Sequence, residues 1–189
     1  MRITIELEDS DIRRFHEALA RAHRLVACAD ETEILAAAKH ALDHLPIACA
    51  PSYVRKRMVE VQRLIVMLED EAWALPPPER EDVVRTLVYF SDPEDMIPDE
   101  VEVIGLLDDA IMLELLLRRL RHVIGAYGSF CAFRASLGPP PQDAAGRIAY
   151  ARRLSRRREA LQRRMRLRGA TAAPARARGT AQARRASSR

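Results

Sequence analysis

The strongest constraint on the fold is the spacing of apolar residues, which recur every three or four positions through most of the chain. This spacing places them along one face of an α-helix, where they can be buried together. Aromatic residues make up only 5% of the 189 residues, so the core must consist mainly of Leu, Ile, Val and Ala. We therefore expect an all-α protein, a compact bundle of about five helices.

Capping residues, prolines and glycines suggest where these helices begin and end. Ser10 and Asp30 are expected to cap the first two helices. The triplet Pro76–Pro78 is expected to end the third helix, and Gly125 and Gly128 to break or kink the fifth. The expected helices cover residues 10–28, 31–44, 51–72, 79–90 and 105–136.

Two further features lie at the edges of this pattern. Ile3, Ile5 and Leu7 alternate with polar residues, which suggests a short N-terminal strand. Trp73, the only tryptophan, is expected to anchor the end of the third helix against the core. Both expectations concern local structure and leave the all-α class unchanged.

Charge divides the chain sharply. Residues 1–146 hold 16 Lys and Arg against 26 Asp and Glu, a net charge of −10, whereas residues 147–189 hold 15 Arg and one acid, a net charge of +14. We predict a helical domain over 1–137, a linker and arginine-rich amphipathic helix over 138–168, and a disordered basic tail over 169–189. An acidic body therefore carries a basic arm.

The sequence suggests a cytoplasmic location. Its first residues become charged within six positions and resemble no signal peptide, and no stretch of about 18 apolar residues predicts a membrane span. Cys28, Cys49 and Cys131 are far apart and odd in number, which favours free thiols over a disulfide framework or a zinc site.

The densest motif spans residues 89–113, YFSDPEDMIPDEVEVIGLLDDAIML. It contains a tyrosine, a small residue with a proline, an Asp, an apolar-Ile-Pro-Asp run, and a Gly-apolar-apolar-Asp-Asp run. These elements fall at Tyr89, Ser91, Pro93, Asp95, Ile97, Pro98, Asp99, Gly105, Leu107, Asp108 and Asp109. The motif resembles that of the YkvA-like family of bacterial proteins, a domain of unknown function. More weakly, residues 1–136 resemble a longer proteobacterial branch of it.

This resemblance implies a helical fold and no established chemistry. Asp92 is an extra residue between Ser91 and the proline. Glu94, Glu100 and Glu102 occupy positions that are often apolar or proline in the family, which argues against contact between this loop and a membrane.

The motif aspartates have several interpretations. They can cap helices, and Asp108 or Asp109 can pair with Arg85 or Arg118. Their oxygens can also bind a divalent cation such as Mg²⁺ or Ca²⁺, or form a protein-contact surface around a buried Tyr89. The candidate interaction or cation site comprises Tyr89, Asp92, Pro93, Asp95, Pro98, Asp99, Gly105, Asp108 and Asp109.

No catalytic residues are predicted. His40 and His44 are four residues apart on an expected helix, but the HExxH pattern of a zinc protease is absent, and packing or solvent-facing roles are favoured. GxSxG, Walker and GxGxxG motifs are also absent.

The arginine-rich arm is the second candidate site. It can bind phosphate backbones or anionic lipid through charge, or rest in solvent or on the acidic body. A narrow apolar stripe comprises Ile148, Ala151, Leu154, Leu161 and Met165, and suits a membrane interface or a partner. The arginines of this arm are Arg147, Arg152, Arg153, Arg156, Arg157, Arg158, Arg163, Arg164, Arg166 and Arg168.

We therefore predict a non-enzymatic interaction or regulatory protein without a cofactor, with an acidic motif face and a basic anion-binding arm. Its predicted partners are an unidentified protein and, through the arm, non-specific nucleic acid or anionic membrane. One alternative is a divalent-cation-binding module or metal-dependent enzyme that uses the aspartates. The other is a peripheral protein of the inner membrane.

Overall fold

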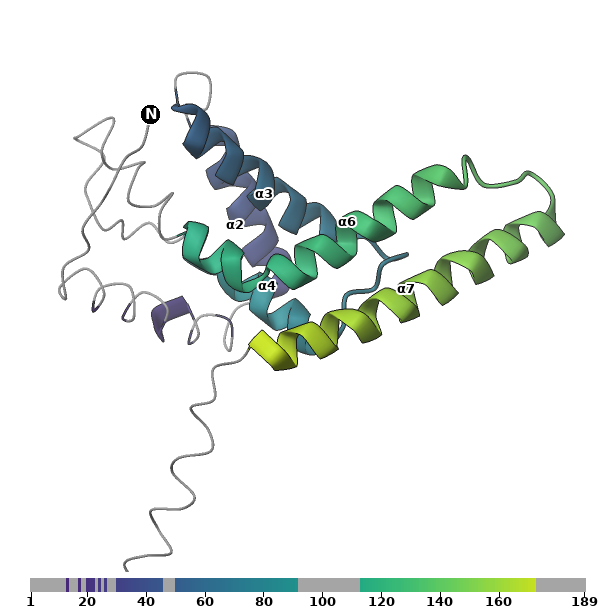
Figure 1. Cartoon of the computed structure of the whole chain (residues 1–189). Coiled ribbons are helices and arrows are strands. Elements are labelled where there is room, and N and C mark those ends of the chain that lie inside the picture. Colours follow the sequence, from purple (N-terminus) through teal and green to yellow (C-terminus); the bar gives the residue numbers. More distant parts are fainter. Residues whose placement is uncertain are drawn as a thin grey trace, which may run out of the picture. The chain divides into compact units, whose positions relative to one another are not determined.

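The protein is all-α. The computed structural model describes residues 13, 17, 20–22, 24, 26, 30–45, 50–91 and 113–172, and within these ranges every regular element is a helix (Figure 1). The long helices are α2 (Glu31–His44), α3 (Ser52–Glu69), α4 (Pro77–Phe90), α6 (Arg121–Ser136) and α7 (Ala144–Ala172). The predicted strand over residues 2–8 lies outside the described ranges and has no support.

By the density of its Cα packing the chain divides into two compact units, Met1–Ile124 and Gly125–Arg189. The division lies inside α6. The domain boundary predicted after residue 137 remains a prediction.

In the first unit, each of the helices α2, α3 and α4 packs against the other two. The apolar residues of α3 recur every three or four positions and form one buried face: Val54, Met58, Val61, Leu64, Ile65 and Leu68 are all buried. The buried face of α2 is narrow, because Ile34 and Ala38 are buried while Leu35 and Leu42 are only half-buried. The described residues of the first predicted helix are helical, and Ala22 among them is fully buried.

The helix boundaries follow local hydrogen bonding. Asp30 caps α2, where its Oδ1 accepts a hydrogen bond from the Thr32 amide at 3.3 Å. After α3 ends at Glu69, the Asp70 carboxylate accepts hydrogen bonds from the amides of Ala72 and Trp73 at 3.1 and 3.2 Å. Trp73 is fully buried in this turn, as predicted. These bonds end α3 without the help of a proline.

The role predicted for the proline triplet is therefore wrong in part. Pro76 is the N-cap of α4, and Pro77 and Pro78 form its first turn. Proline suits this position because its φ is already helical and its missing N–H would have no partner within the helix. The triplet begins one helix several residues after the previous one has ended.

The predicted helix over residues 105–136 is interrupted at a different place. Residues 113–119 are helical, Leu120 forms a turn, and α6 then continues through Gly125 and Gly128. A Cβ atom added at either glycine would meet no atom within 4 Å, so both lie on an open side of the helix. The surrounding helical hydrogen bonds outweigh the cost of glycine, about 1 kcal/mol per residue.

The second unit is a helical hairpin. Gly138 ends α6 with a left-handed φ of +71°, a conformation that favours glycine. Asp143 then caps α7, since its Oδ1 accepts a hydrogen bond from the Gly146 amide at 2.7 Å. The Arg157 guanidinium of α7 lies 5.5 Å from the centre of the Phe133 ring of α6. The helix α7 extends to Ala172, four residues into the predicted tail.

Candidate functional site

Most of the predicted motif site lies outside the described residues. Of the residues in this site, the structure describes Tyr89. It was predicted to be buried, but it is half-buried and packs against Leu116. Two residues later, the Ser91 hydroxyl donates to the carbonyl oxygens of Leu87 and Val88 at 3.0 and 3.3 Å and so caps the end of α4. The residues of this site outside the described ranges are Asp92, Pro93, Asp95, Pro98, Asp99, Gly105, Asp108 and Asp109.

The two arginines suggested as partners of Asp108 and Asp109 have acidic partners on their own helices. Arg85 binds Glu81 at 2.7 Å and Asp82 at 3.0 Å. Arg118 binds Glu114 at 2.7 Å. These pairs are three or four residues apart, as helical geometry requires.

Glu114 also binds Arg57 of α3, a contact between distant segments that the sequence did not predict. The Arg57 guanidinium lies 5.0 Å from the centre of the Tyr53 ring. Burial raises the pKa of the Tyr53 hydroxyl, against the opposing effect of the Arg57 charge. Ion pairing, ring stacking and burial account for this cluster as a structural link within the first unit.

The remaining candidates for chemistry carry no site in the described part of the chain. The rings of His40 and His44 are stacked, with centroids 3.9 Å apart, and His44 Nδ1 lies 2.7 Å from the His40 carbonyl oxygen. Cys131 is half-buried and free, whereas Cys28 and Cys49 lie outside the described residues. No group of three potential metal ligands occurs among the residues described.

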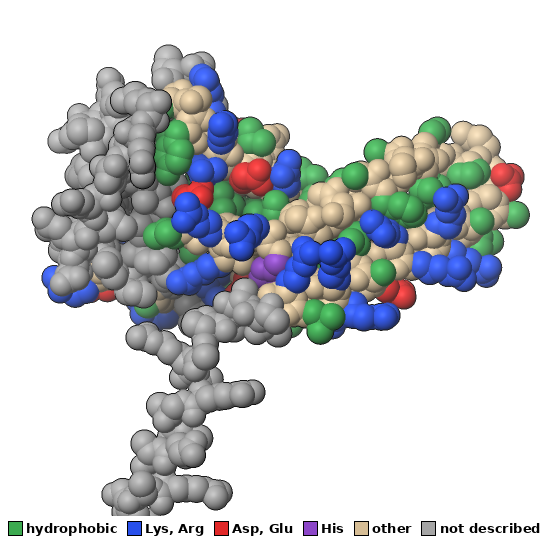
Figure 2. Space-filling model, in the orientation of Figure 1, with side chains coloured by type: hydrophobic (Ala, Val, Ile, Leu, Met, Phe, Trp, Pro, Cys, Tyr) green, Lys and Arg blue, Asp and Glu red, His purple; other side chains and the backbone are tan. Residues whose placement is uncertain are grey.

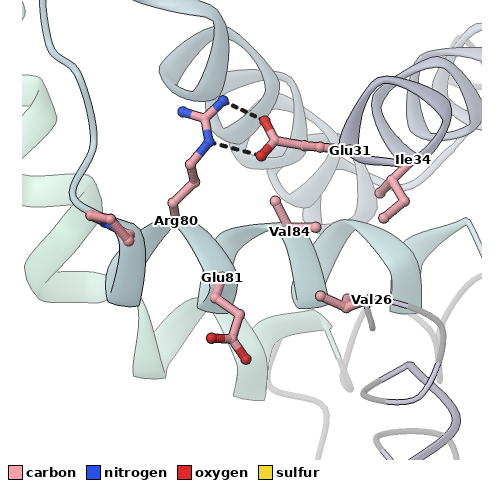
Figure 3. Close-up of a pocket in the computed structure, with 7 residues that line it drawn as sticks. Val26, Glu31, Ile34, Arg80, Glu81 and Val84 are labelled. Carbon is pink, nitrogen blue, oxygen red and sulfur yellow. Dashed lines mark hydrogen bonds and ion pairs between the residues drawn. The ribbon is translucent and has the colours of Figure 1, made fainter. Parts of the chain in front are cut away.

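A small pocket of about 230 Å³ lies in the first unit between α2 and α4 (Figure 3). Arg80 and Glu31 face each other there in a bidentate ion pair, with Arg80 Nε 2.8 Å from Glu31 Oε2. Arg80 also donates to the Leu68 carbonyl at 3.1 Å. Each nitrogen of the guanidinium thus has a partner, and the rest of the lining is mostly apolar. The charged pair in this pocket connects α4 to α2, and the bond to Leu68 connects it to α3.

The arginines of α7 are arranged very differently. Seven of them are exposed and form neither an ion pair nor a hydrogen bond within the described part of the chain: Arg152, Arg153, Arg156, Arg157, Arg163, Arg164 and Arg166. The helix carries ten arginines and one acid, Glu159, a net charge of +9. Blue side chains recur along its length in Figure 2. This concentration of accessible positive charge is the strongest functional feature described.

The helical repeat sorts six of these arginines into two rows. Runs of consecutive arginines begin at residues 152, 156 and 163, and the first two arginines of each run contribute one side chain to each row. Successive residues project about 100° apart around the helix, and the two rows therefore diverge by about that angle. The first row comprises Arg152, Arg156 and Arg163, and the second comprises Arg153, Arg157 and Arg164.

The apolar stripe predicted on this helix is mostly unavailable to a partner. Leu154, Leu161 and Met165 are buried, and Met165 is only 1% exposed. Ile148, by contrast, is 54% exposed, and Ala151 is also exposed. The outward surface of α7 is therefore basic. None of the described helices is long and apolar enough to cross a membrane.

Comparison with known proteins gives one match. Residues 83–115 match the model of a family described as "Protein of unknown function (DUF1232)". The match begins in the buried part of α4, covers the signature motif and ends beside Glu114. Neither a curated protein nor a solved structure matches the chain.

Proposed function

We propose that this chain is a non-enzymatic interaction protein that binds polyanions through α7. The observation that carries the proposal is the set of seven exposed arginines of α7 that have neither an ion pair nor a hydrogen bond in the described part of the chain. Exposed positive charges at this density attract multiply charged anions and release counterions on binding. The role requires no resident cofactor.

The motif that resembles the YkvA-like family forms, in this proposal, a separate contact surface for a protein partner. The match of residues 83–115 to a family model supports a domain shared with that family. The motif is acidic whereas the arm is basic, so the two surfaces suit different partners. We place the protein in the cytoplasm, where polyanions of the cell are accessible to it.

The test is retention of the full-length chain on heparin, a flexible polyanion, in a salt gradient. Replacement of Arg152, Arg156 and Arg163 by Gln should weaken binding roughly tenfold or more, because three counterion-releasing contacts are lost. The matched control replaces Arg55, Lys56 and Arg63, three exposed basic residues of the first unit, by Gln. If both variants elute at the same salt concentration, the assignment to α7 is wrong.

The cation-dependent alternative has its own test. Thermal melts of the full-length chain with Mg²⁺, Ca²⁺, Mn²⁺ and Zn²⁺ should show no shift that depends on the motif. A stabilisation abolished by Asp95→Asn or Asp108→Asn would replace the proposed non-enzymatic role with a metal-dependent one.

A further inference from the structure

The two rows of arginines on α7 leave a narrow strip between them. Within the length of the rows, the residue that projects into this strip is Ala160, which is small and exposed. Ala149, also exposed, lies in nearly the same direction before the rows, and the exposed Leu167 lies in that direction after them. A small residue at such a position allows another surface to approach the helix backbone closely. When another molecule approaches the helix between the two rows, each row can contact a separate line of negative charge on that molecule.

We infer that α7 lies in the major groove of B-form DNA, with one row of arginines on the phosphates of each strand, an inference that rests on the proposed polyanion binding. An α-helix is about 10–12 Å across with its side chains, and the major groove is about 12 Å wide. The first row, from Arg152 to Arg163, rises about 16 Å along the helix axis. Duplex DNA presents one phosphate charge about every 1.7 Å of its axis, so each arginine has phosphates within reach.

Other anionic partners fit the described surface less well. A membrane-surface helix needs a continuous apolar face, but the large exposed apolar residues of α7 are Ile148 and Leu167, about 28 Å apart along the axis. Single strands are bound by stacking on aromatic rings, and the one aromatic residue of α7, Tyr150, is half-buried with its hydroxyl 3.4 Å from the Gly138 carbonyl. The major groove of double-stranded RNA is too narrow for side chains to read.

The exposed face of α7 is suited to contact with phosphates but has few side chains that could recognise bases. Arginine can pair with guanine, but asparagine is absent from α7, and its one glutamine, Gln162, is buried. Binding should therefore depend strongly on salt and weakly on sequence. With six phosphate contacts, the slope of log affinity against log salt should be about −5.

The discriminating variant is Ala160→Trp, which fills the strip between the rows and leaves the charge unchanged. Its matched control is Ala160→Ser, which keeps a small side chain. Binding of the full-length proteins is measured by fluorescence anisotropy to a 20-bp duplex of mixed sequence, about two turns of B-DNA. The probes compared with it are heparin, double-stranded RNA of the same sequence, polyglutamate and vesicles of phosphatidylglycerol, and circular dichroism checks that each variant is folded.

We expect Ala160→Trp to weaken duplex DNA binding by tenfold or more while heparin binding stays unchanged. Replacing either row by Gln should reduce the salt slope by about 3. If Ala160→Trp binds DNA like the wild type, or if RNA, polyglutamate or vesicles bind as tightly as DNA, the groove model is wrong, although retained heparin binding would leave the proposed function intact. If the wild-type protein does not bind heparin, both the groove model and the proposed function are wrong.

Discussion

The helices α4 and α7 use arginine in opposite ways. On α4, Arg80 and Arg85 both pair with acids, and Arg80 connects three helices through Glu31 and Leu68. On α7, six arginines arranged in two rows have no acidic partner in the described part of the chain. The comparison shows that pairing, more than the number of charges, separates arginines that support the fold from arginines available to a partner.

The largest expected effect on stability comes from truncating a buried side chain of the first unit. Trp73 is fully buried, so Trp73→Ala should reduce the free energy of unfolding by about 3–5 kcal/mol through lost burial and a residual cavity. Urea unfolding followed by circular dichroism measures the change, because the variant lacks the only tryptophan. A loss below about 1 kcal/mol would mean that the site is far less tightly packed than described.

A smaller effect is expected from breaking the ion pair of α4. Arg80→Met should cost about 1–2 kcal/mol, since the pair with Glu31 is only about one-third exposed and a bond to Leu68 is also lost. The matched control is Arg85→Met, whose partners lie on the same helix and are more than half exposed. Urea midpoints should separate the two variants, and equal losses would contradict the structural role assigned to Arg80.

The cap of α7 allows a comparable test in the second unit. Asp143→Ala should destabilise the start of the helix by about 1 kcal/mol, because the Gly146 amide loses its acceptor. Hydrogen exchange at the amides of Gly146 and Arg147 should accelerate. Asp143→Asn keeps a capping oxygen and should remain close to the wild type; equal acceleration in both variants would argue against capping.

The smallest expected effect concerns pH. Burial raises the pKa of Tyr53 above its value in the unfolded chain. The neutral hydroxyl is therefore favoured by folding, and its contribution to stability is complete below the unfolded pKa, about 10, and is lost as the pH rises through the folded pKa. Subtracting the ultraviolet pH titration of Tyr53→Phe from that of the wild type isolates the ionisation of Tyr53, and its midpoint should lie above 10. A midpoint at or below 10 would show that the Arg57 charge outweighs burial.

Much of the fold could be predicted from local signals. Apolar spacing identified α2 and α3, and Asp30 caps the helix for which it was predicted. Predictions that required neighbours were less accurate. The proline triplet could be assigned to the end of α3 or the start of α4, and only the turn at Asp70 shows which.

For the candidate site, the sequence by itself determined the charge of the arm and its helical periodicity, because both depend only on which residues occur and at what spacing. The tertiary structure decided which faces are available. It buries Leu154, Leu161 and Met165, leaves the two rows of arginines exposed, and pairs Glu31 with Arg80 across 49 positions. Burial and long-range pairing depend on which segments meet in space, and a periodic pattern cannot specify its own partner.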